Sequence, residues 1–366
     1  MSTDPQIREV GRLQEGTPTA IESPPQALPA PFKRYRPQIE AGLRESFCGR
    51  TSPVHDMLRY SLGWTDEQGR PGGGFAGKGL RPTLCLFACE AAGGTVSRAM
   101  PAAVALELIH NFSLIHDDIQ DRDELRHHRP TLWSVWGDPK ALVAGNTLRV
   151  IADSSVHRLV EAGGDLDSAL RVAGLLTEAY LQMIEGQYLD LAYEGRPRIT
   201  VDEYFSMIAL KTGALIRGSL HIGATIGTSD PRTVERFKEC GRALGLIFQV
   251  RDDILGVWGD EEVTGKPVGA DIRRKKNSFP IVYAMSKAAE KDRRSLESIY
   301  SKEFLDDSDV TTVLEIMERT GVQEMAHRIA SEGCDDALHG LDAVEMSAAA
   351  RRDIEETARF LLVRER

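Results

Sequence analysis

The chain has 366 residues, of which 42% are hydrophobic and 6% aromatic, and its formal net charge is −10. This length allows one large domain or two ordinary ones, and the apolar content suffices for a sizeable core. The negative charge argues against a nucleic-acid partner. No apolar run reaches the ~18–20 residues of a membrane span, and we expect no signal peptide. Five cysteines without a Cys-x-x-Cys pair indicate reduced thiols in a cytoplasmic protein.

The chain begins with a polar segment. Residues 1–31 are rich in Pro, Gly, Glu and Ser and are predicted to form a flexible N-terminal arm. Residues 32–366 are predicted to form one all-helical domain, in which a Gly-rich loop at 65–79 precedes long apolar segments of helical period. These segments predict helices over 84–92, 102–119, 167–192, 201–226 and 234–255. Because no segment alternates strictly, we expect no sheet, and the predicted fold is an all-α, single-domain bundle of long helices.

Three aspartates mark the end of the helix predicted over 102–119. Asp117 and Asp121 are four residues apart, so they lie on one face of a helix about one turn apart. Such carboxylates repel each other unless a cation lies between them, and Mg²⁺ prefers carboxylate oxygens together with substrate phosphates. A solvated acidic face is the alternative. The apolar flanks favour the metal site, because a mostly buried helix does not hold three free carboxylates, Asp118 included.

A second acidic pair, Asp252-Asp253, lies within the apolar segment 234–255. Two acidic pairs far apart in the sequence, each inside an apolar helix, predict carboxylates that face each other across a cavity. A metal-bound polyphosphate could be held between such walls. Two unrelated surface patches are the alternative interpretation.

Basic residues near these motifs suit an anionic ligand. Lys78 and Arg81 lie at the start of a predicted helix, where backbone N–H groups favour anions and arginine can bind phosphate with two hydrogen bonds. Lys211 stands in an apolar helix, where an unpaired ammonium would be costly. His110, seven residues before Asp117, is either a ligand contact or a satisfied core histidine. Taken singly, the remaining cations are more typical of solvated surface: Arg126, Arg129, Lys266, Lys275 and Lys276.

Several segments, taken in chain order, resemble the motifs of the trans-isoprenyl diphosphate synthases (polyprenyl synthetase family), over about residues 40–350. The matching segments are Gly77-Lys78-Gly79-Leu80-Arg81-Pro82, His110 with Asp117-Asp118-Ile119-Gln120-Asp121, Arg126-His127-His128-Arg129-Pro130-Thr131, Gly186-Gln187-Tyr188-Leu189-Asp190, Lys211-Thr212, Gln249 with Asp252-Asp253, and Gly265-Lys266-Pro267-Val268-Gly269-Ala270-Asp271 followed by Lys276.

The resemblance implies helices around a deep central cavity, a homodimer, and Mg²⁺-dependent condensation of an allylic diphosphate with isopentenyl diphosphate. It implies that two or three Mg²⁺ ions are held by Asp117, Asp121 and Asp252, with Asp118 and Asp253 in support. The allylic diphosphate would be bound by Arg126, Lys211, Lys266 and Lys276, with Thr212 and Gln249 near the reacting carbons. Isopentenyl diphosphate would be bound by Lys78, Arg81 and His110.

Two positions depart from the family pattern. The second acidic motif usually ends in a third acid, but here that residue is Gly256. We expect this change to weaken one metal site or to leave its shell to water, without loss of activity, because Asp252 remains. An arginine that normally binds isopentenyl diphosphate is His127 in this chain. Because the charge of histidine varies near neutral pH, we expect this substrate to bind more weakly above pH ~7.

Product length is predicted from the residues just before the first aspartate motif. Ser113 is small and leaves room for a growing chain, whereas Phe112 is bulky and could form a partial floor. The combination is most similar to geranylgeranyl (C20) synthases, so we expect a C20 main product. A farnesyl (C15) or longer-chain synthase, a non-catalytic subunit of a heteromeric synthase, a terpene cyclase and a purely structural helical protein are the alternatives.

Overall fold

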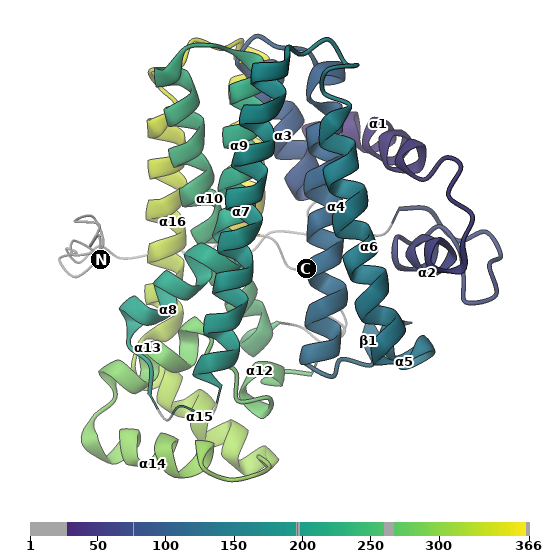
Figure 1. The fold of residues 1–366 in the computed structure, drawn as a ribbon. Helices are drawn as coiled ribbons and strands as arrows, with labels where there is room; N and C mark the ends of the chain where they lie inside the picture. Colours follow the sequence, from purple (N-terminus) through teal and green to yellow (C-terminus); the bar gives the residue numbers. More distant parts are fainter. Residues whose placement is uncertain (1–27, 76, 195, 197, 260–266, 364–366) are drawn as a thin grey trace.

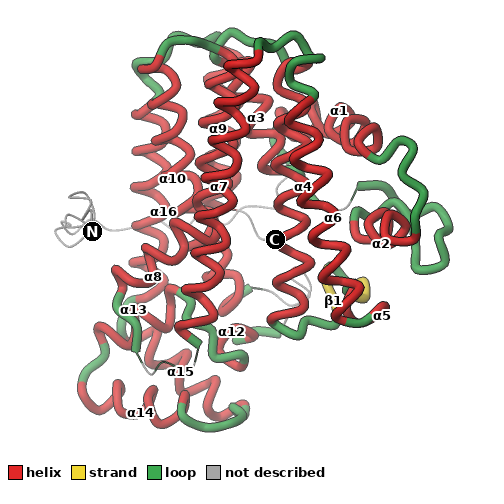
Figure 2. Tube along the Cα trace, viewed as in Figure 1, coloured by secondary structure: helices red, strands yellow, loops and turns green. Residues whose placement is uncertain are grey.

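The protein is described by a computed structural model, which covers residues 28–75, 77–194, 196, 198–259 and 267–363. Helices dominate the described chain, and one short antiparallel sheet is present (Figure 1, Figure 2). In chain order the elements are α1 (Ala30–Ser46), α2 (Pro53–Ser61), α3 (Leu80–Ala91), α4 (Val96–Gln120), β1 (Leu125–Arg126), β2 (Arg129–Pro130), α5 (Leu132–Trp136), α6 (Asp138–His157), α7 (Leu166–Tyr193), α8 (Val201–Ile208), the π-helical turn η2 (Ala209–Gly213), α9 (Ala214–Gly227), α10 (Pro231–Trp258), α12 (Ala270–Arg273), α13 (Phe279–Lys287), α14 (Glu290–Tyr300), α15 (Asp307–Arg319), α16 (Val322–Gly340) and α17 (Ala348–Val363).

The long helices α4, α6, α7, α9, α10 and α16 form an upright bundle (Figure 1). The shorter helices α12 to α15 lie at one end of this bundle, and α1 and α2 lie on one side of it. The aspartate motifs belong to two of the long helices, α4 and α10, near the end at which the shorter helices gather. The bundle therefore places both motifs at one end of the molecule.

The innermost helices are apolar on almost every face. In α3 every residue except Glu90 is buried, and α3 packs directly against α9. A Cβ added at Gly223 of α9 would lie 2.1 Å from the carbonyl oxygen of Cys85. Glycine is therefore required for this close approach, and the apolar pattern of both helices follows from their burial.

The buried side chains form two apolar clusters, and α10 runs through both. Leu244 and Ile247 belong to the larger cluster, whereas Val250 and Ile254 belong to a smaller cluster formed with α8 and with α13 to α16. Gln249 and the second acidic pair lie where α10 passes from one cluster to the other. Polar groups at such a junction need partners, because the surrounding side chains supply none.

Side-chain caps fix the starts of three helices that carry site residues. Asp165 caps α7 and Asp230 caps α10, each by accepting a hydrogen bond from a backbone N–H of the first turn. Thr200 and Glu203 form a reciprocal capping box at the start of α8. Each cap contributes about 1 kcal/mol to helix stability, and together they define where the helices that carry site residues begin.

The all-α fold is confirmed, with two differences in detail. The helix expected over 201–226 is interrupted by η2, and the expectation of no sheet was wrong for the short hairpin of β1 and β2, whose strands have two residues each. The predicted arm at 1–31 falls mainly on residues 1–27, which lie outside the described residues, so its flexibility stays a prediction. Within the described ranges, no helix is both long and apolar enough to cross a membrane.

Candidate active site

The first aspartate motif closes the C-terminal end of α4. Asp118 is buried, and its Oδ1 atom lies 2.7 Å from both Nε and Nη2 of Arg126 in β1. The turn of this hairpin holds His127 and His128 at φ values of 50° and 61°. Two successive positive φ values are typical of a tight hairpin turn, so the hairpin fixes where Arg126 meets the motif.

Asp117 is half-buried and carries a proton more readily than an ordinary aspartate. Burial, together with the charges of Asp121 and Asp190, raises its pKa from 3.8 to about 6, although Lys211 and Arg126 act in the opposite direction. Lys211 and Arg126 therefore do not fully offset the effects that favour the protonated form of Asp117. A further cation close to Asp117 would stabilise its ionised form.

Lys211 lies between these acids and forms an ion pair with Asp190 of α7. Burial lowers the pKa of Lys211, but Asp190, Asp117 and Asp121 outweigh that effect, so the pKa is raised and the side chain stays charged. Lys211 lies in η2, and π-helical turns of this kind are frequent at functional sites. A Cβ at Gly186 of α7 would lie 2.1 Å from the backbone nitrogen of Lys211. Glycine at 186 therefore brings this turn against α7.

A chain of hydrogen bonds joins the second aspartate motif to η2. Thr212 Oγ1 donates to Gln249 Oε1 at 2.6 Å, and Gln249 Nε2 donates to Asp253 Oδ1 at 2.8 Å. The hydroxyl of Tyr204 and the backbone N–H of Phe279 both donate to Asp253 Oδ2. Burial raises the pKa of Asp253 to about 7, and the three donors moderate that effect. The chain fixes the orientation of the Thr212 hydroxyl and of the Gln249 amide.

The other predicted residues of this region are placed less directly. Asp252 is half-buried on α10 beside Asp253, and the charge of Lys276 acts on Glu194 at the end of α7, as does that of Lys211. Lys266 lies outside the described residues. Among the described residues no three His, Cys, Asp or Glu side chains are grouped to hold a metal ion. The opposition of Asp117 and Asp252 stays a prediction.

Two residues predicted to bind the second substrate, Arg81 and His127, act electrostatically on a third, His110, which lies earlier on α4. Burial and the charges of Arg81, Arg126 and His127 hold the pKa of His110 well below its usual range, so the ring is neutral near pH 7. Arg81 is buried at the start of α3. Lys78 Nζ lies 5.7 Å from the centre of the Phe360 ring. Arg129, by contrast, donates to the carbonyl oxygen of Thr65, a structural contact.

Glu107 is a residue of this region that the sequence analysis missed. It is 3% exposed and lies one turn before His110 on α4. Burial raises its pKa from 4.5 to about 7, despite the charges of Arg81 and Arg36 and a hydrogen bond from Asn111. A glutamate inside the otherwise apolar segment 102–109 was the available signal.

The space in front of Gly256 is filled by another carboxylate. A Cβ added at Gly256 would lie 2.0 Å from Oδ2 of Asp271, which belongs to α12. The third acid of the motif is therefore replaced by a glycine against which Asp271 packs, and not by open space. Asp271 and Asp190 belong to the sequence motifs but have no role predicted from them. Nothing in the sequence pattern indicates that Tyr204 belongs to the site.

The chain matches the family model for polyprenyl synthetases over residues 74–317. It is 40% identical to a short chain isoprenyl diphosphate synthase of Methanothermobacter thermautotrophicus, over 91% of this chain and 98% of that protein. It is 37% identical to the (2E,6E)-farnesyl diphosphate synthase of Mycobacterium tuberculosis, over 85% of this chain and 86% of that one.

The chain belongs to the polyprenyl synthetase family. Among solved structures, the geranylgeranyl pyrophosphate synthetase of Pyrococcus horikoshii superposes with a TM-score of 0.82 at 34% identity, covering 92% of this chain and 98% of that one. As a polyprenyl synthetase the protein is a prenyltransferase, and the family predicted from its motifs is confirmed. These relatives carry names for different product lengths, so membership of the family leaves the product length open.

The pKa of Glu107 gives the first prediction. Because the folded state holds a proton that the unfolded state releases, the free energy of unfolding should fall as the pH rises from about 4.5 to about 7. A shift of this size corresponds to a loss on the order of 3 kcal/mol. In Glu107→Gln this part of the pH dependence should disappear, as measured by urea unfolding between pH 4.5 and 8. The exposed Glu235→Gln variant is the control, and parallel curves for Glu107→Gln and the parent would contradict the prediction.

Restoring the missing acid should damage the fold. In Gly256→Asp the new side chain overlaps the Asp271 carboxylate, so we expect a loss of about 1–3 kcal/mol from overpacking, with charge repulsion in addition. Thermal unfolding measures this loss. The double variant Gly256→Asp/Asp271→Gly should recover most of it. Gly174→Asp, in α7 where nothing lies within 4 Å, is the control. A Gly256→Asp protein as stable as the parent would show that Asp271 does not occupy this space.

Proposed function

We propose that the protein condenses isopentenyl diphosphate with an allylic diphosphate in a Mg²⁺-dependent reaction, and that the main product is geranylgeranyl diphosphate (C20). One observation carries the proposal: Asp117, Asp121 and Asp190 gather around one half-buried lysine, Lys211, which forms an ion pair with Asp190, while burial raises the pKa of Asp117. We expect such a group of carboxylates around one lysine to bind a metal-bound diphosphate better than a proton or a free anion. The reaction breaks the C–O bond of the allylic substrate, forms a C–C bond and releases a proton.

The donor set fits Mg²⁺. Asp117, Asp121 and Asp252 offer only carboxylate oxygens, which hard cations prefer, and Mg²⁺ usually keeps several waters and binds substrate phosphates as well. Because the described residues form no complete metal cage, we propose that two or three ions complete their shells with water and diphosphate. The bound ions would neutralise the leaving diphosphate. Asp118 contacts Arg126, and Asp253 accepts hydrogen bonds from three donors. These contacts would hold the neighbouring backbone in place.

Protein cations complete the diphosphate site. Lys211 Nζ has three N–H donors and Arg126 has five, so each can bind a phosphate oxygen and keep its contact with an aspartate. Lys276 follows α12 in the chain and would contribute to this site. Lys266, which lies outside the described residues, is predicted to contribute as well. Positive charge that is already in position stabilises the charge that develops on the leaving group without a cost for reorganisation.

Oriented dipoles lie next to this cation set. Thr212 donates its proton to Gln249, so the lone pairs of its oxygen stay available for the allylic carbocation. Neither group traps the cation covalently, and the apolar surroundings keep water from reaching it. The second substrate, isopentenyl diphosphate, would be bound directly by neutral His110 together with Lys78, Arg81 and His127.

The neighbours of Phe112 support its proposed role as a floor. It is 8% exposed, and its ring centre lies 4.6 Å from that of His116, which in turn contacts Gly145 of α6. Ser113 donates its hydroxyl to the backbone of His110, so only a small side chain occupies that position. The buried ring of Phe112 next to the small side chain of Ser113 supports a product longer than C15.

We also propose that the protein is a homodimer. Among the described residues, eight of the twelve exposed large apolar side chains lie on α6 and α7, which pack against each other: Leu142, Val143, Val150, Leu166, Leu170, Leu181, Ile184 and Tyr188. Exposed apolar side chains gathered on one face indicate a protein interface. Sedimentation velocity at micromolar concentration would detect the dimer. The cytoplasmic location predicted from the sequence agrees with the free cysteines, of which four are buried.

The decisive experiment incubates the pure protein with Mg²⁺, labelled isopentenyl diphosphate and each allylic primer, and then measures product length. We expect C20 products, none in the presence of a chelator, and a loss of at least ~100-fold in kcat for Asp117→Asn and Lys211→Gln. The exposed Asp56→Asn variant is the control. Cyclic hydrocarbons would indicate a terpene cyclase instead, and inactivity with every primer would indicate a non-catalytic subunit.

The floor assignment predicts the direction of two substitutions. Phe112→Ala should lengthen the main product by at least one five-carbon unit, because the chain can then extend past the position of the ring. Ser113→Phe should shorten it to C15. Product sizing by chromatography distinguishes these outcomes, and Phe304→Ala, at an exposed position, is the control. Unchanged product lengths in both variants would refute the assignment.

A further inference from the structure

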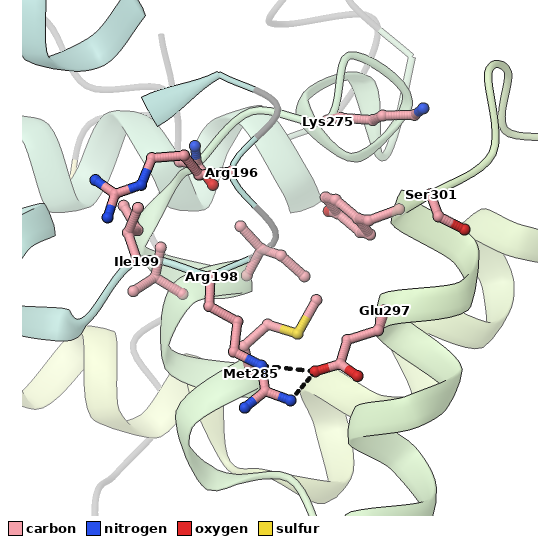
Figure 3. Close-up of a pocket in the computed structure, with 11 residues that line it drawn as sticks. Arg196, Arg198, Ile199, Lys275, Met285, Glu297 and Ser301 are labelled. Carbon is pink, nitrogen blue, oxygen red and sulfur yellow. Dashed lines mark hydrogen bonds and ion pairs between the residues drawn. The ribbon is translucent and has the colours of Figure 1, made fainter. Parts of the chain in front are cut away.

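One pocket is lined by residues that have no role in the candidate active site. Its walls come from Arg196, Arg198 and Ile199, from the segment after α12, and from α13 and α14 (Figure 3). Its volume is about 310 Å³, within the range of small-molecule sites. The floor is apolar and includes Ile199 and Met285, whereas the rim is polar. The pocket therefore combines the two features that an amphiphilic ligand needs.

Positive charge dominates the rim, although the whole chain carries −10. Arg196, Arg198 and Lys275 line the pocket together with one carboxylate, Glu297. Glu297 accepts hydrogen bonds from Arg198, from Nε at 2.6 Å and from Nη2 (Figure 3). The Nζ atom of Lys275 has no hydrogen-bond or ion-pair partner among the described residues. Arg196 in turn lies 3.4 Å from Oε1 of Glu203, which is outside the lining. An anion in the pocket would therefore meet three cations, of which two already contact an acid.

Tyr300 supplies an unused hydrogen bond to the same space. It lines the pocket, and its buried hydroxyl has no hydrogen-bond partner in the part of the chain that the structure describes. Burial and the charge of Asp271 raise the pKa of this hydroxyl, so it remains a donor at every physiological pH. A buried donor without an acceptor is destabilising, and an acceptor oxygen from a ligand would remove that cost.

We propose that this pocket binds an amphiphilic phosphate ester, with the phosphate or diphosphate at Arg196, Arg198 and Lys275 and a short hydrocarbon chain on the apolar floor. The identity of the natural ligand rests on the proposed function, because the isoprenyl diphosphates of that reaction have this chemistry. Inorganic diphosphate, the other product of the reaction, shares only the charged part. The apolar floor favours the ester.

The pocket shares backbone with the active site but not side chains. Arg196 and Arg198 lie between α7, which carries Asp190, and α8, which carries Tyr204. Asn277, also in the lining, donates to the carbonyl oxygen of Tyr193 at 2.8 Å. A bound ester would therefore contact the segments that join the active-site helices without competing for the catalytic residues.

The test measures binding of geranyl monophosphate and inorganic diphosphate by calorimetry, in a chelator so that metal-dependent binding is removed. We expect geranyl monophosphate to bind at least tenfold more weakly to Arg198→Gln/Lys275→Gln than to the parent. Glu297→Gln, which frees Arg198, should bind it several-fold more tightly. Arg294→Gln, an exposed arginine of α14 outside the pocket, is the matched control. With geranyl monophosphate, hydrogen exchange should show protection of residues 198–199 and 296–301 in the parent and in Arg294→Gln, but not in the double variant.

Three results would overturn the proposal: equal affinities in the parent and the double variant, no protection of these segments, or equally tight binding of inorganic diphosphate. The proposed function fails separately. A protein that binds the ester in this pocket but makes no prenyl product would refute the synthase alone. An active synthase with no binding here would refute the pocket alone.

Discussion

The need to compensate buried carboxylates organises this molecule more than any other constraint. Asp118 is neutralised by Arg126, Asp190 by Lys211, and Asp253 by three hydrogen-bond donors. Burial nevertheless raises the pKa of Asp117 to about 6 and that of Asp253 to about 7. At these two positions the ionised carboxylate is stabilised by a further cation or hydrogen-bond donor nearby, and a proton is the alternative.

Close backbone approach makes that arrangement possible. Gly186 lets α7 touch η2 at Lys211, and a Cβ at Gly245 of α10 would lie 2.8 Å from the Cα atom of Gly213 in the same turn. The π-helical turn is therefore held between two long helices, with Lys211 and Thr212 presented side by side. A regular helix through this region would rotate the residues after the turn relative to those before it, and Lys211 and Gln249 would not both keep their partners.

Sequence alone predicted the helices and the acidic motifs, because both depend on local spacing. The period of apolar residues determined α4, α7 and α10 to within a few residues, and the cost of burying Lys211 predicted that it has a charged partner. Contacts between distant segments could not be predicted in this way. Tyr204 gave no signal because its bond to Asp253 depends on how α8 packs on α10, and the contact of Asp271 with Gly256 depends on a loop that no periodicity describes.

The two ends of the proposed substrate site differ in how they meet a diphosphate. In the proposed reaction, the diphosphate near Asp117 would bind together with metal ions, because carboxylates form much of that site. Around His110, burial and the charges of Arg81, Arg126 and His127 keep the ring neutral, and burial leaves Glu107 largely protonated below pH 7. A diphosphate there would bind the protein directly. The asymmetry suits a reaction in which one diphosphate must leave and the other must stay, because metal ions stabilise the leaving group only at the first position.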